Sequence, residues 1–170
     1  MITVPRFPLL ETPEAWDDLT LVAATIYLEA KGEPDEGQVA VGWVIRERMT
    51  RWGLTLQQVL LGPEGKAYGD GKPYEPYSCW NDDYQQVAEA KLGAATGEDA
   101  SRAWRAAAGA LWRLLPNPVE SAMYYLNVEL TKKIRRDGKL PTWAADPQDP
   151  KHVNTEKVVA VLGRHTFVRA

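Results

Sequence analysis

Glu29 is the residue whose type and position are best suited to acid–base chemistry. At 100° per residue its side chain falls about 20° from that of Val22, on the edge of the apolar face of a predicted helix. It also lies in the last helical turn, where the helix dipole disfavours negative charge. Both effects favour the protonated carboxyl group, which is the form a general acid needs. A glutamate that merely flanks the core and pairs with Lys31 or Arg48 fits the same spacing.

A second carboxylate, Glu33, follows four residues later, between Gly32 and Pro34. These neighbours break the helix, so the two carboxylates need not share one helix face. We expect Glu33 to accept backbone N–H groups around the turn before the next helix. Asp35 and Glu36 are predicted to cap that helix.

Trp80 and Asn81 end a long aromatic loop, residues 62–82, which holds four glycines and three prolines. Loops of this length in compact domains are usually functional or mobile. A Trp face can stack on a sugar ring, and an Asn amide can bind hydroxyl or N-acetyl groups. A Trp that anchors the loop to the core, followed by an Asn helix cap, explains the same two residues equally well.

Other kinds of site find little support in the sequence. His152, His165 and Cys79 lack the spacing of a metal site, and no Gly-rich phosphate loop is present. Nothing in the sequence indicates a lowered pKa for Cys79, so a Cys79–His165 nucleophile pair is not favoured. We therefore expect no metal and no cofactor.

Composition limits the class of protein. The 170 residues include 45% hydrophobic and 25% charged residues, as in an ordinary globular domain. The net charge of −3 argues against duplex nucleic acid as a partner. No apolar stretch approaches the roughly 20 residues needed to span a bilayer, so no membrane insertion is expected. No basic segment followed by an apolar one begins the chain, so no secretory signal is visible.

Hydrophobic periodicity predicts an α+β fold that is mostly helical, with a small β-hairpin or sheet. Residues 1–12 are interpreted as an extended lead-in and residues 13–170 as one domain, which we expect to be a monomer. The segment Val39–Ile45 is apolar on every side, which indicates a helix buried in the core. The predicted elements are helices at 13–30, 36–51, 55–61, 82–92 and 99–115, a strand at 122–127, and a hairpin of 158–162 and 165–168.

Four motifs, in order along the chain, resemble those of the SleB-type cell wall hydrolases, which include the spore-cortex-lytic enzymes. The first, Ile26–Arg48, reads IYLEAKGEPDEGQVAVGWVIRER and is long and specific. The others are weaker: YSCWND at 77–82, AMYYLN at 122–127 and LGRHTF at 162–167. The stretch between Asn127 and Trp143 is longer and more basic than expected for the family.

The resemblance implies a lysozyme-like fold and an enzyme that cleaves the MurNAc–GlcNAc bond of peptidoglycan. Family members are typically lytic transglycosylases, and their catalytic glutamate aligns with Glu29. The resemblance further implies that glycan strands are the partner and that a group of residues lines the substrate cleft. These predicted substrate-binding residues are Glu33, Trp80, Asn81, Tyr125 and Asn127.

Several alternatives stay open at this stage. A hydrolytic lysozyme would need a second carboxylate, for which Glu33 and Asp82 are candidates. A wall-binding or virion protein without catalysis, and a peptidase or amidase, are the other readings. The basic run 132–136 is interpreted as a solvated face that could meet anionic wall polymers. The missing export signal fits a phage lysin or virion-associated enzyme acting on the wall after release, or a protein kept in the cytoplasm until exported.

Overall fold

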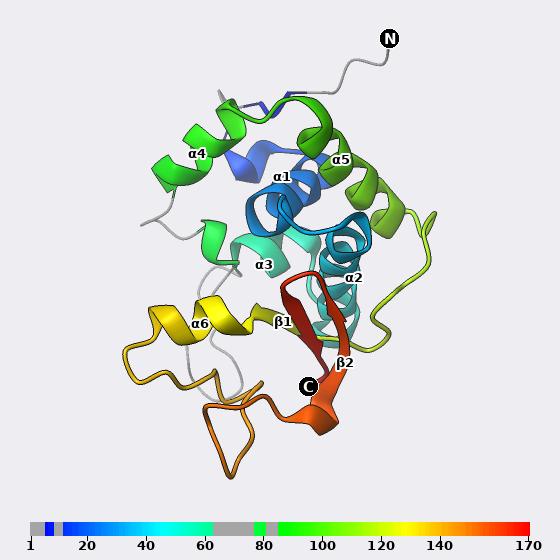
Figure 1. The fold of residues 1–170 in the computed structure, drawn as a ribbon. Coiled ribbons are helices and arrows are strands. Elements are labelled where there is room, and N and C mark those ends of the chain that lie inside the picture. Colours follow the sequence, from blue (N-terminus) through cyan, green and yellow to red (C-terminus); the bar gives the residue numbers. More distant parts are fainter. Residues whose placement is uncertain (1–5, 9–11, 63–76, 81–84) are drawn as a thin grey trace.

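The computed structural model describes residues 6–8, 12–62, 77–80 and 85–170, and about half of the chain is helical (Figure 1). A small antiparallel sheet completes the fold, as the sequence predicts. The α-helices are α1 (Asp18–Ala30), α2 (Asp35–Trp52), α3 (Leu56–Leu61), α4 (Gln85–Gly93), α5 (Gly97–Leu111) and α6 (Val128–Ile134). The 3-10 helices are η1 (Pro13–Ala15), η2 (Ser78–Trp80) and η4 (Thr155–Lys157). The strands are β1 (Tyr124–Asn127), β2 (Val158–Leu162) and β3 (His165–Val168).

The main core lies where α1 and α2 pack against α5. Val41, Val44 and Ile45 of α2 are fully buried, so the prediction of a core helix is confirmed. Gly42 allows the close approach of two helices, because a Cβ atom there would lie 2.7 Å from the Cβ of Ala110 on α5. This packing fixes the direction of α1 and hence the position of its C-terminal end.

The predicted C-terminal hairpin is confirmed, and it joins a third strand. The strand order is β1-β3-β2, with both pairs antiparallel, so β3 is the central strand. Tyr125 on β1 pairs with Phe167, and Asn127 pairs with His165. Gly163 takes a φ of +59° in the β2–β3 turn, a conformation that favours glycine. In Figure 1 the sheet lies at the lower end of α2, and α6 extends from β1.

The first helix begins later than predicted. Thr12 precedes only a short 3-10 turn, and Trp16 is extended and buried in the core. Asp17 then caps α1, since its Oδ1 accepts the backbone N–H of Thr20 at 2.8 Å. The extended backbone at Trp16 buries its indole and interrupts the predicted helix, and Asp17 then provides the new helix start.

Two other helix ends also differ from prediction. Pro34, rather than Asp35 or Glu36, is the N-cap of α2, and both acids lie in its first turn, where they complement the dipole. Helix α5 begins at Gly97 after Thr96, not at Asp99, and ends at Leu111.

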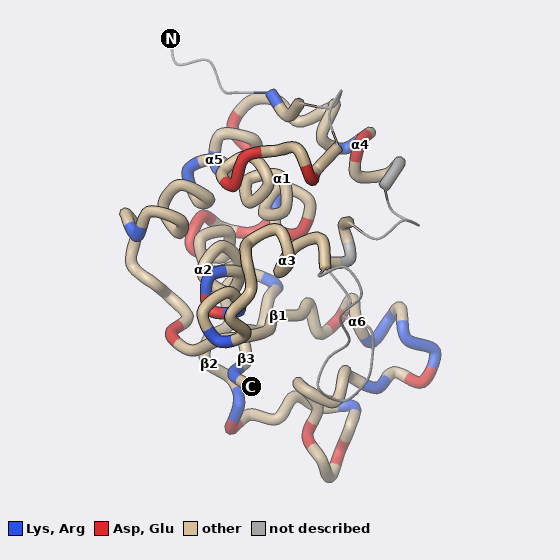
Figure 2. Tube along the Cα trace, turned by 180° about the vertical axis from the view of Figure 1, so that it is seen from behind, with Lys and Arg blue, Asp and Glu red and all other residues tan. Residues whose placement is uncertain are grey.

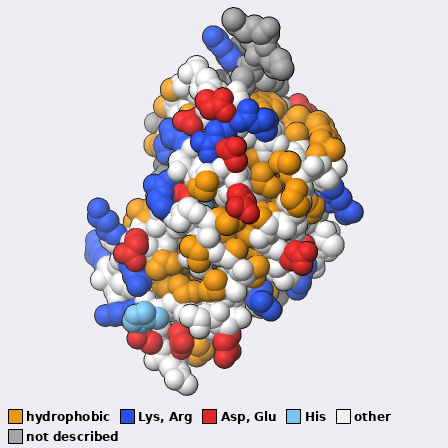
Figure 3. All heavy atoms as spheres, turned by 45° about the vertical axis from the view of Figure 1, so that its right-hand side comes forward, with side chains coloured by type: hydrophobic (Ala, Val, Ile, Leu, Met, Phe, Trp, Pro, Cys, Tyr) orange, Lys and Arg blue, Asp and Glu red, His pale blue; other side chains and the backbone are white. Residues whose placement is uncertain are grey.

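The early end of α5 has a local cause. Arg113 adopts a left-handed φ of 56°, and the N–H groups of Leu114 and Leu115 return to the carbonyl of Gly109. Leu115 thus folds back over Gly109. Trp112 and Leu114, just after the end of α5, have exposed side chains. Figure 3 shows hydrophobic side chains gathered on this side of the molecule.

The basic run 132–136 begins in the last turn of α6, a short helix that periodicity did not predict, and continues beyond it. Asn127 caps α6 through a hydrogen bond from the N–H of Leu130 to its Oδ1 at 3.0 Å. The predicted caps of α4, Asp82 and Asp83, lie outside the described residues. Within the described residues, no helix is both long and apolar enough to cross a bilayer.

Candidate active site

Glu29 occupies the last turn of α1 and is half-buried where three elements meet. Its Oε1 accepts the backbone N–H of Cys79 from η2, and its Oε2 accepts the hydroxyl of Tyr125 from β1, both at 3.4 Å. These distances are at the long end of the hydrogen-bond range. Catalytic hydrogen bonds are often long before substrate binds. The carboxyl group is therefore oriented by two neutral donors that come from distant parts of the chain.

Tyr125 is held by aromatic neighbours on the sheet. Its ring centroid lies 5.1 Å from that of His165, 5.7 Å from that of Phe167 and 6.3 Å from that of Tyr77. Burial raises the pKa of Tyr125 well above its ordinary value, and the negative charge of Glu29 raises it further. The hydroxyl therefore stays protonated and can donate to Glu29.

The η2 segment is attached to α1 one turn before Glu29. The indole N–H of Trp80 donates to Oγ1 of Thr25 at 2.9 Å, and the ring lies edge-on to Trp16 at 5.9 Å. Trp80 is half-buried and packs against the core, so it anchors this segment, and its sugar-binding role stays a prediction. Burial raises the pKa of the Cys79 thiol well above its usual value, with Glu29 adding to the effect. The thiol is therefore a poor nucleophile.

Glu33 has a different environment from Glu29, being only 3% exposed. Its Oε2 accepts the backbone N–H of Arg164 at 2.7 Å, and its Oε1 accepts Nε of the same residue at 2.8 Å. The carboxylate lies against the β2–β3 turn, where a Cβ atom on Gly163 would come within 2.1 Å of Oε2. The expected acceptance of a backbone N–H is present, but the donor belongs to the C-terminal hairpin. Substrate binding by Glu33 stays a prediction.

His165 lies on β3 next to Tyr125 and is 7% exposed. Burial lowers its pKa, while Glu33 and Glu29 act in the opposite direction and Arg164 lowers it again. Within the described residues, its buried Nδ1 atom has no hydrogen-bond partner. The imidazole is thus held mainly neutral among the side chains that surround Glu29.

Two predicted substrate-binding residues remain, Asn127 and Asn81, and the structure describes only the first. Asn127 stands at the end of β1, where its side chain caps α6. Asn81 lies outside the described residues, as does Asp82. Binding of substrate by Asn127 and Asn81 therefore stays a prediction.

Two arginines near the site were missed by sequence reasoning. Arg164 pairs with Glu33, and its only signal is its place in the turn just before His165. Arg48 donates from Nε to the carbonyl of Met123 at 2.8 Å, and its guanidinium lies 4.8 Å from the ring centroid of Tyr77. It thereby connects α2 to the start of β1. The sequence offered Arg48 as a possible partner of Glu29, and its contacts with Met123 and Tyr77 were not predicted.

The arrangement offers one carboxyl group for proton transfer beside a second that is already neutralised by a cation. Such a site can protonate a leaving group and later remove a proton from a hydroxyl group. In the part of the chain that the structure describes, no group of three or more His, Cys, Asp or Glu residues is arranged to hold a metal ion.

Three comparisons place this chain among known proteins. Residues 32–168 match the cell wall hydrolase family. Over 99 residues the chain is 34% identical to the spore cortex-lytic enzyme of Oceanobacillus iheyensis, covering 55% of this chain and 34% of that protein. The chain thus spans about a third of the length of that curated relative.

The structure is similar to the catalytic domain of the germination-specific lytic transglycosylase SleB from Bacillus anthracis. The TM-score is 0.50 at 22% sequence identity, covering 93% of this chain and 100% of that domain. At this level of identity the likeness concerns the fold, and it confirms the lysozyme-like α+β architecture.

Proposed function

The chain belongs to the cell wall hydrolase family, which matches residues 32–168, and we propose that it degrades peptidoglycan as a lytic transglycosylase. The bond cut is the glycosidic bond between MurNAc and GlcNAc, with Glu29 serving first as acid and then as base. The activities of two similar proteins, a spore cortex-lytic enzyme and a lytic transglycosylase, support this assignment.

The observation that carries the proposal is the environment of Glu29. The carboxyl group is half-buried at the end of α1, and each of its oxygens has a neutral donor at 3.4 Å. The group thus lies where α1, η2 and β1 meet, and both of its oxygens are held in place. The two donors also stabilise the carboxylate that is left when the proton has been transferred.

The reaction needs a single carboxyl group. Glu29 donates its proton to the glycosidic oxygen, the bond to C1 of MurNAc breaks, and the GlcNAc leaves with a free 4-hydroxyl. The resulting Glu29 carboxylate removes the proton from the 6-hydroxyl of MurNAc as that oxygen bonds to C1. A 1,6-anhydro ring forms, no water is consumed, and Glu29 is protonated again.

The position of Glu33 supports this route over hydrolysis. A hydrolytic lysozyme normally needs a second carboxylate that faces the sugar or a water molecule. Glu33 is the nearest candidate in the sequence, and its two oxygens are already bound by Arg164. In this proposal Tyr125 positions Glu29, and Trp80, Asn81 and Asn127 contribute to the cleft that holds the glycan.

Replacing Glu29 with glutamine tests the proposal. Removal of a general acid typically lowers rates by 10²–10⁴, so we expect the clearing of purified sacculi to fall about 10³-fold. The thermal midpoint should stay within about 2 °C of the wild type, because the amide has nearly the same size. Glu120→Gln, at an exposed glutamate far along the chain, is the matched control and should keep full activity.

Mass spectrometry of the released muropeptides identifies the reaction. Anhydro-muropeptides are expected, and these are lighter by one water than the products of hydrolysis. Reducing ends would instead indicate a muramidase, and free peptides would indicate an amidase or peptidase. Full activity of Glu29→Gln would remove Glu29 from the mechanism.

A further inference from the structure

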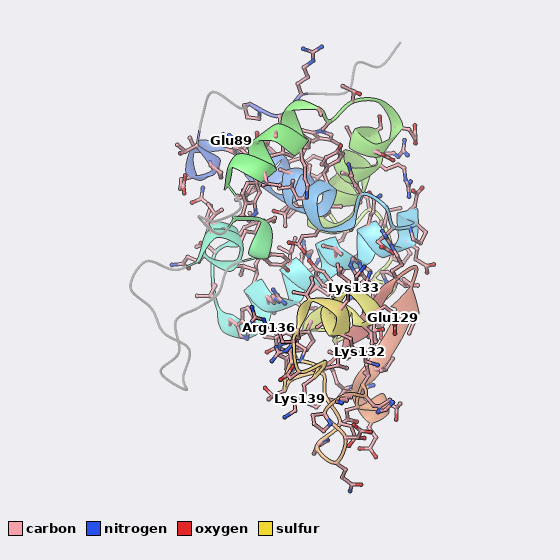
Figure 4. All side chains as sticks on the ribbon, turned by 60° about the vertical axis from the view of Figure 1, so that its left-hand side comes forward. Glu89, Glu129, Lys132, Lys133, Arg136 and Lys139 are labelled. Carbon is pink, nitrogen blue, oxygen red and sulfur yellow. The ribbon has the colours of Figure 1, made fainter. Side chains whose placement is uncertain are left out.

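A dense group of basic side chains lies on α6 and the loop that follows it. Residues 128–139 contain five basic and two acidic residues, giving a formal charge of +3, whereas the whole chain carries −3. The rest of the chain therefore carries −6. Figure 2 shows this basic stretch after α6, and Figure 4 shows that its side chains spread over the helix and the loop. We name the group the α6 basic surface; its members are Lys132, Lys133, Arg135, Arg136 and Lys139.

In the residues that the structure describes, most of these cations lack an ion-pair partner. Arg135 lies 3.7 Å from Asp137, but in the described part of the chain no ion pair involves any of the four other cations. The dipole of α6 favours Lys132 and Lys133 in its last turn, which accounts for two of them structurally. It does not account for Arg136 and Lys139, which lie beyond the helix.

The same helix also exposes apolar side chains. Leu130 and Ile134, one turn apart, are 51% and 70% exposed, and no residue of α6 is buried. The helix therefore contributes little to the core. Its outer surface combines hydrocarbon with positive charge, which complements a ligand that combines apolar groups with carboxylates.

The α6 basic surface follows the candidate active site closely along the chain. Tyr125, which donates to Glu29, precedes the α6 cap Asn127 by two residues on β1. At the usual rise of strand and helix, the Cα atom of Lys132 lies within about 15 Å of that of Tyr125. A peptide of four extended residues spans a similar length, about 13–14 Å.

We propose that the α6 basic surface binds the carboxylates of the peptide stems carried by the glycan strand that is being cut. The inference rests on the proposed function and narrows its substrate class to peptidoglycan whose stems are present and whose carboxylates are free. Stem peptides combine alanine methyl groups with acidic side chains, so they match both the cations and the exposed Leu130 and Ile134. Each MurNAc sugar holds its stem within reach of α6 when its bond lies at Glu29.

The test compares one variant on three substrates. The variant replaces Lys132, Lys133, Arg136 and Lys139 with glutamine; the control replaces four exposed cations elsewhere, Arg6, Arg51, Lys151 and Arg169. The substrates are intact sacculi, sacculi whose carboxylates have been amidated chemically, and glycan strands stripped of stems by an amidase. Exposed ion pairs contribute a few tenths of a kcal/mol each, so four give about a tenfold loss of kcat/KM on intact sacculi.

That loss should be confined to one variant and one substrate. The α6 variant should match the wild type on amidated and stripped substrates, and the control variant should match it on all three. The preference of the wild type for intact sacculi should also decline as salt is raised. An α6 variant that keeps the wild-type preference for intact sacculi would overturn the proposal.

A binding measurement separates this inference from the proposed activity. Glu29→Gln protein should co-sediment with intact sacculi more strongly than with amidated sacculi, and the α6 substitutions should remove that difference. Absence of cleavage on every substrate would refute the proposed function without affecting this result. Loss of binding only on sacculi that retain phosphate polymers, and not on sacculi freed of them by hydrofluoric acid, would assign the surface to those polymers and overturn the proposal.

Discussion

The end of α1 and the turn that follows it each present a glutamate, four residues apart, in opposite environments. Glu29 is half-buried and contacts a tyrosine hydroxyl and a backbone N–H at 3.4 Å. Glu33 is buried and bound at 2.7 and 2.8 Å by both the backbone and the guanidinium of one arginine. The difference arises from what the last part of the chain brings to each, because Tyr125 is neutral whereas Arg164 is a cation.

Two residues of the same type can thus differ in the chemistry that they can perform, because their contacts differ. Loosely held by neutral donors, a carboxyl group can exchange its proton as the reaction requires. Once fixed by a cation and a backbone N–H, it instead connects two parts of the fold. The turn between α1 and α2 is thus joined to the β2–β3 turn by Glu33, whereas Glu29 contacts η2 and β1.

Among the substitutions that test the difference between the two glutamates, Glu33→Gln should have the largest effect, and that effect is on stability. The amide cannot form the charge-assisted bonds to Arg164, so we expect a loss of about 2 kcal/mol in the free energy of unfolding. Urea unfolding measures this loss, and activity on sacculi at a temperature where the variant is folded should remain within about threefold of the wild type. Arg164→Lys, which keeps the charge and the backbone N–H bond but loses the bond from Nε, should cost less. A folded Glu33→Gln protein without activity would place Glu33 in the chemistry and break the contrast.

A smaller effect, on rate rather than stability, is expected from Tyr125→Phe. Loss of the hydroxyl that donates to Oε2 of Glu29 should lower kcat about tenfold, equivalent to about 1.4 kcal/mol, with little change in KM. Tyr124→Phe is the matched control. Its side chain points to the other face of the sheet and stacks on Trp143 at 4.9 Å, so its rate should not change. Equal losses in both variants would mean that the Tyr125 hydroxyl does not act on Glu29.

The smallest effect is expected at His165. Burial lowers its pKa below the ordinary value of 6.5, so in acid the unfolded chain binds a proton before the folded chain does. The stability that neutral His165 contributes is therefore present above about pH 6.5 and is lost as the pH falls below it. Between pH 7.5 and pH 5 the thermal midpoint of the His165→Asn variant should therefore fall less than that of the wild type. His152→Asn, at the exposed second histidine, should leave the wild-type slope unchanged, and an unchanged slope in both variants would refute the prediction.

Local sequence patterns predicted the parts of the fold that depend on neighbouring residues. The apolar run Val39–Ile45 identified the buried helix, the Gly163-Arg164 turn identified the hairpin, and helical spacing placed Glu29 at the edge of the core. Each of these features follows from a period of 3.6 or 2 residues, or from turn chemistry.

The remaining features depend on contacts that no local pattern contains. Arg164 and Glu33 are 131 residues apart, and either could have faced solvent. The break before α1 arises from burial of Trp16, and the early end of α5 from Leu115 folding back over Gly109. In each case tertiary packing outweighed the local preference of the chain.

The central position of β3 has a consequence for the order in which the protein matures. Strand β1, which carries Tyr125, pairs with residues 165–168, which leave the ribosome last among the elements described. Until those residues emerge, a nascent chain contains Glu29 and Tyr125 but lacks the strand that pairs with β1. The contacts around Glu29 are thereby completed only after residues 165–168 have been synthesised.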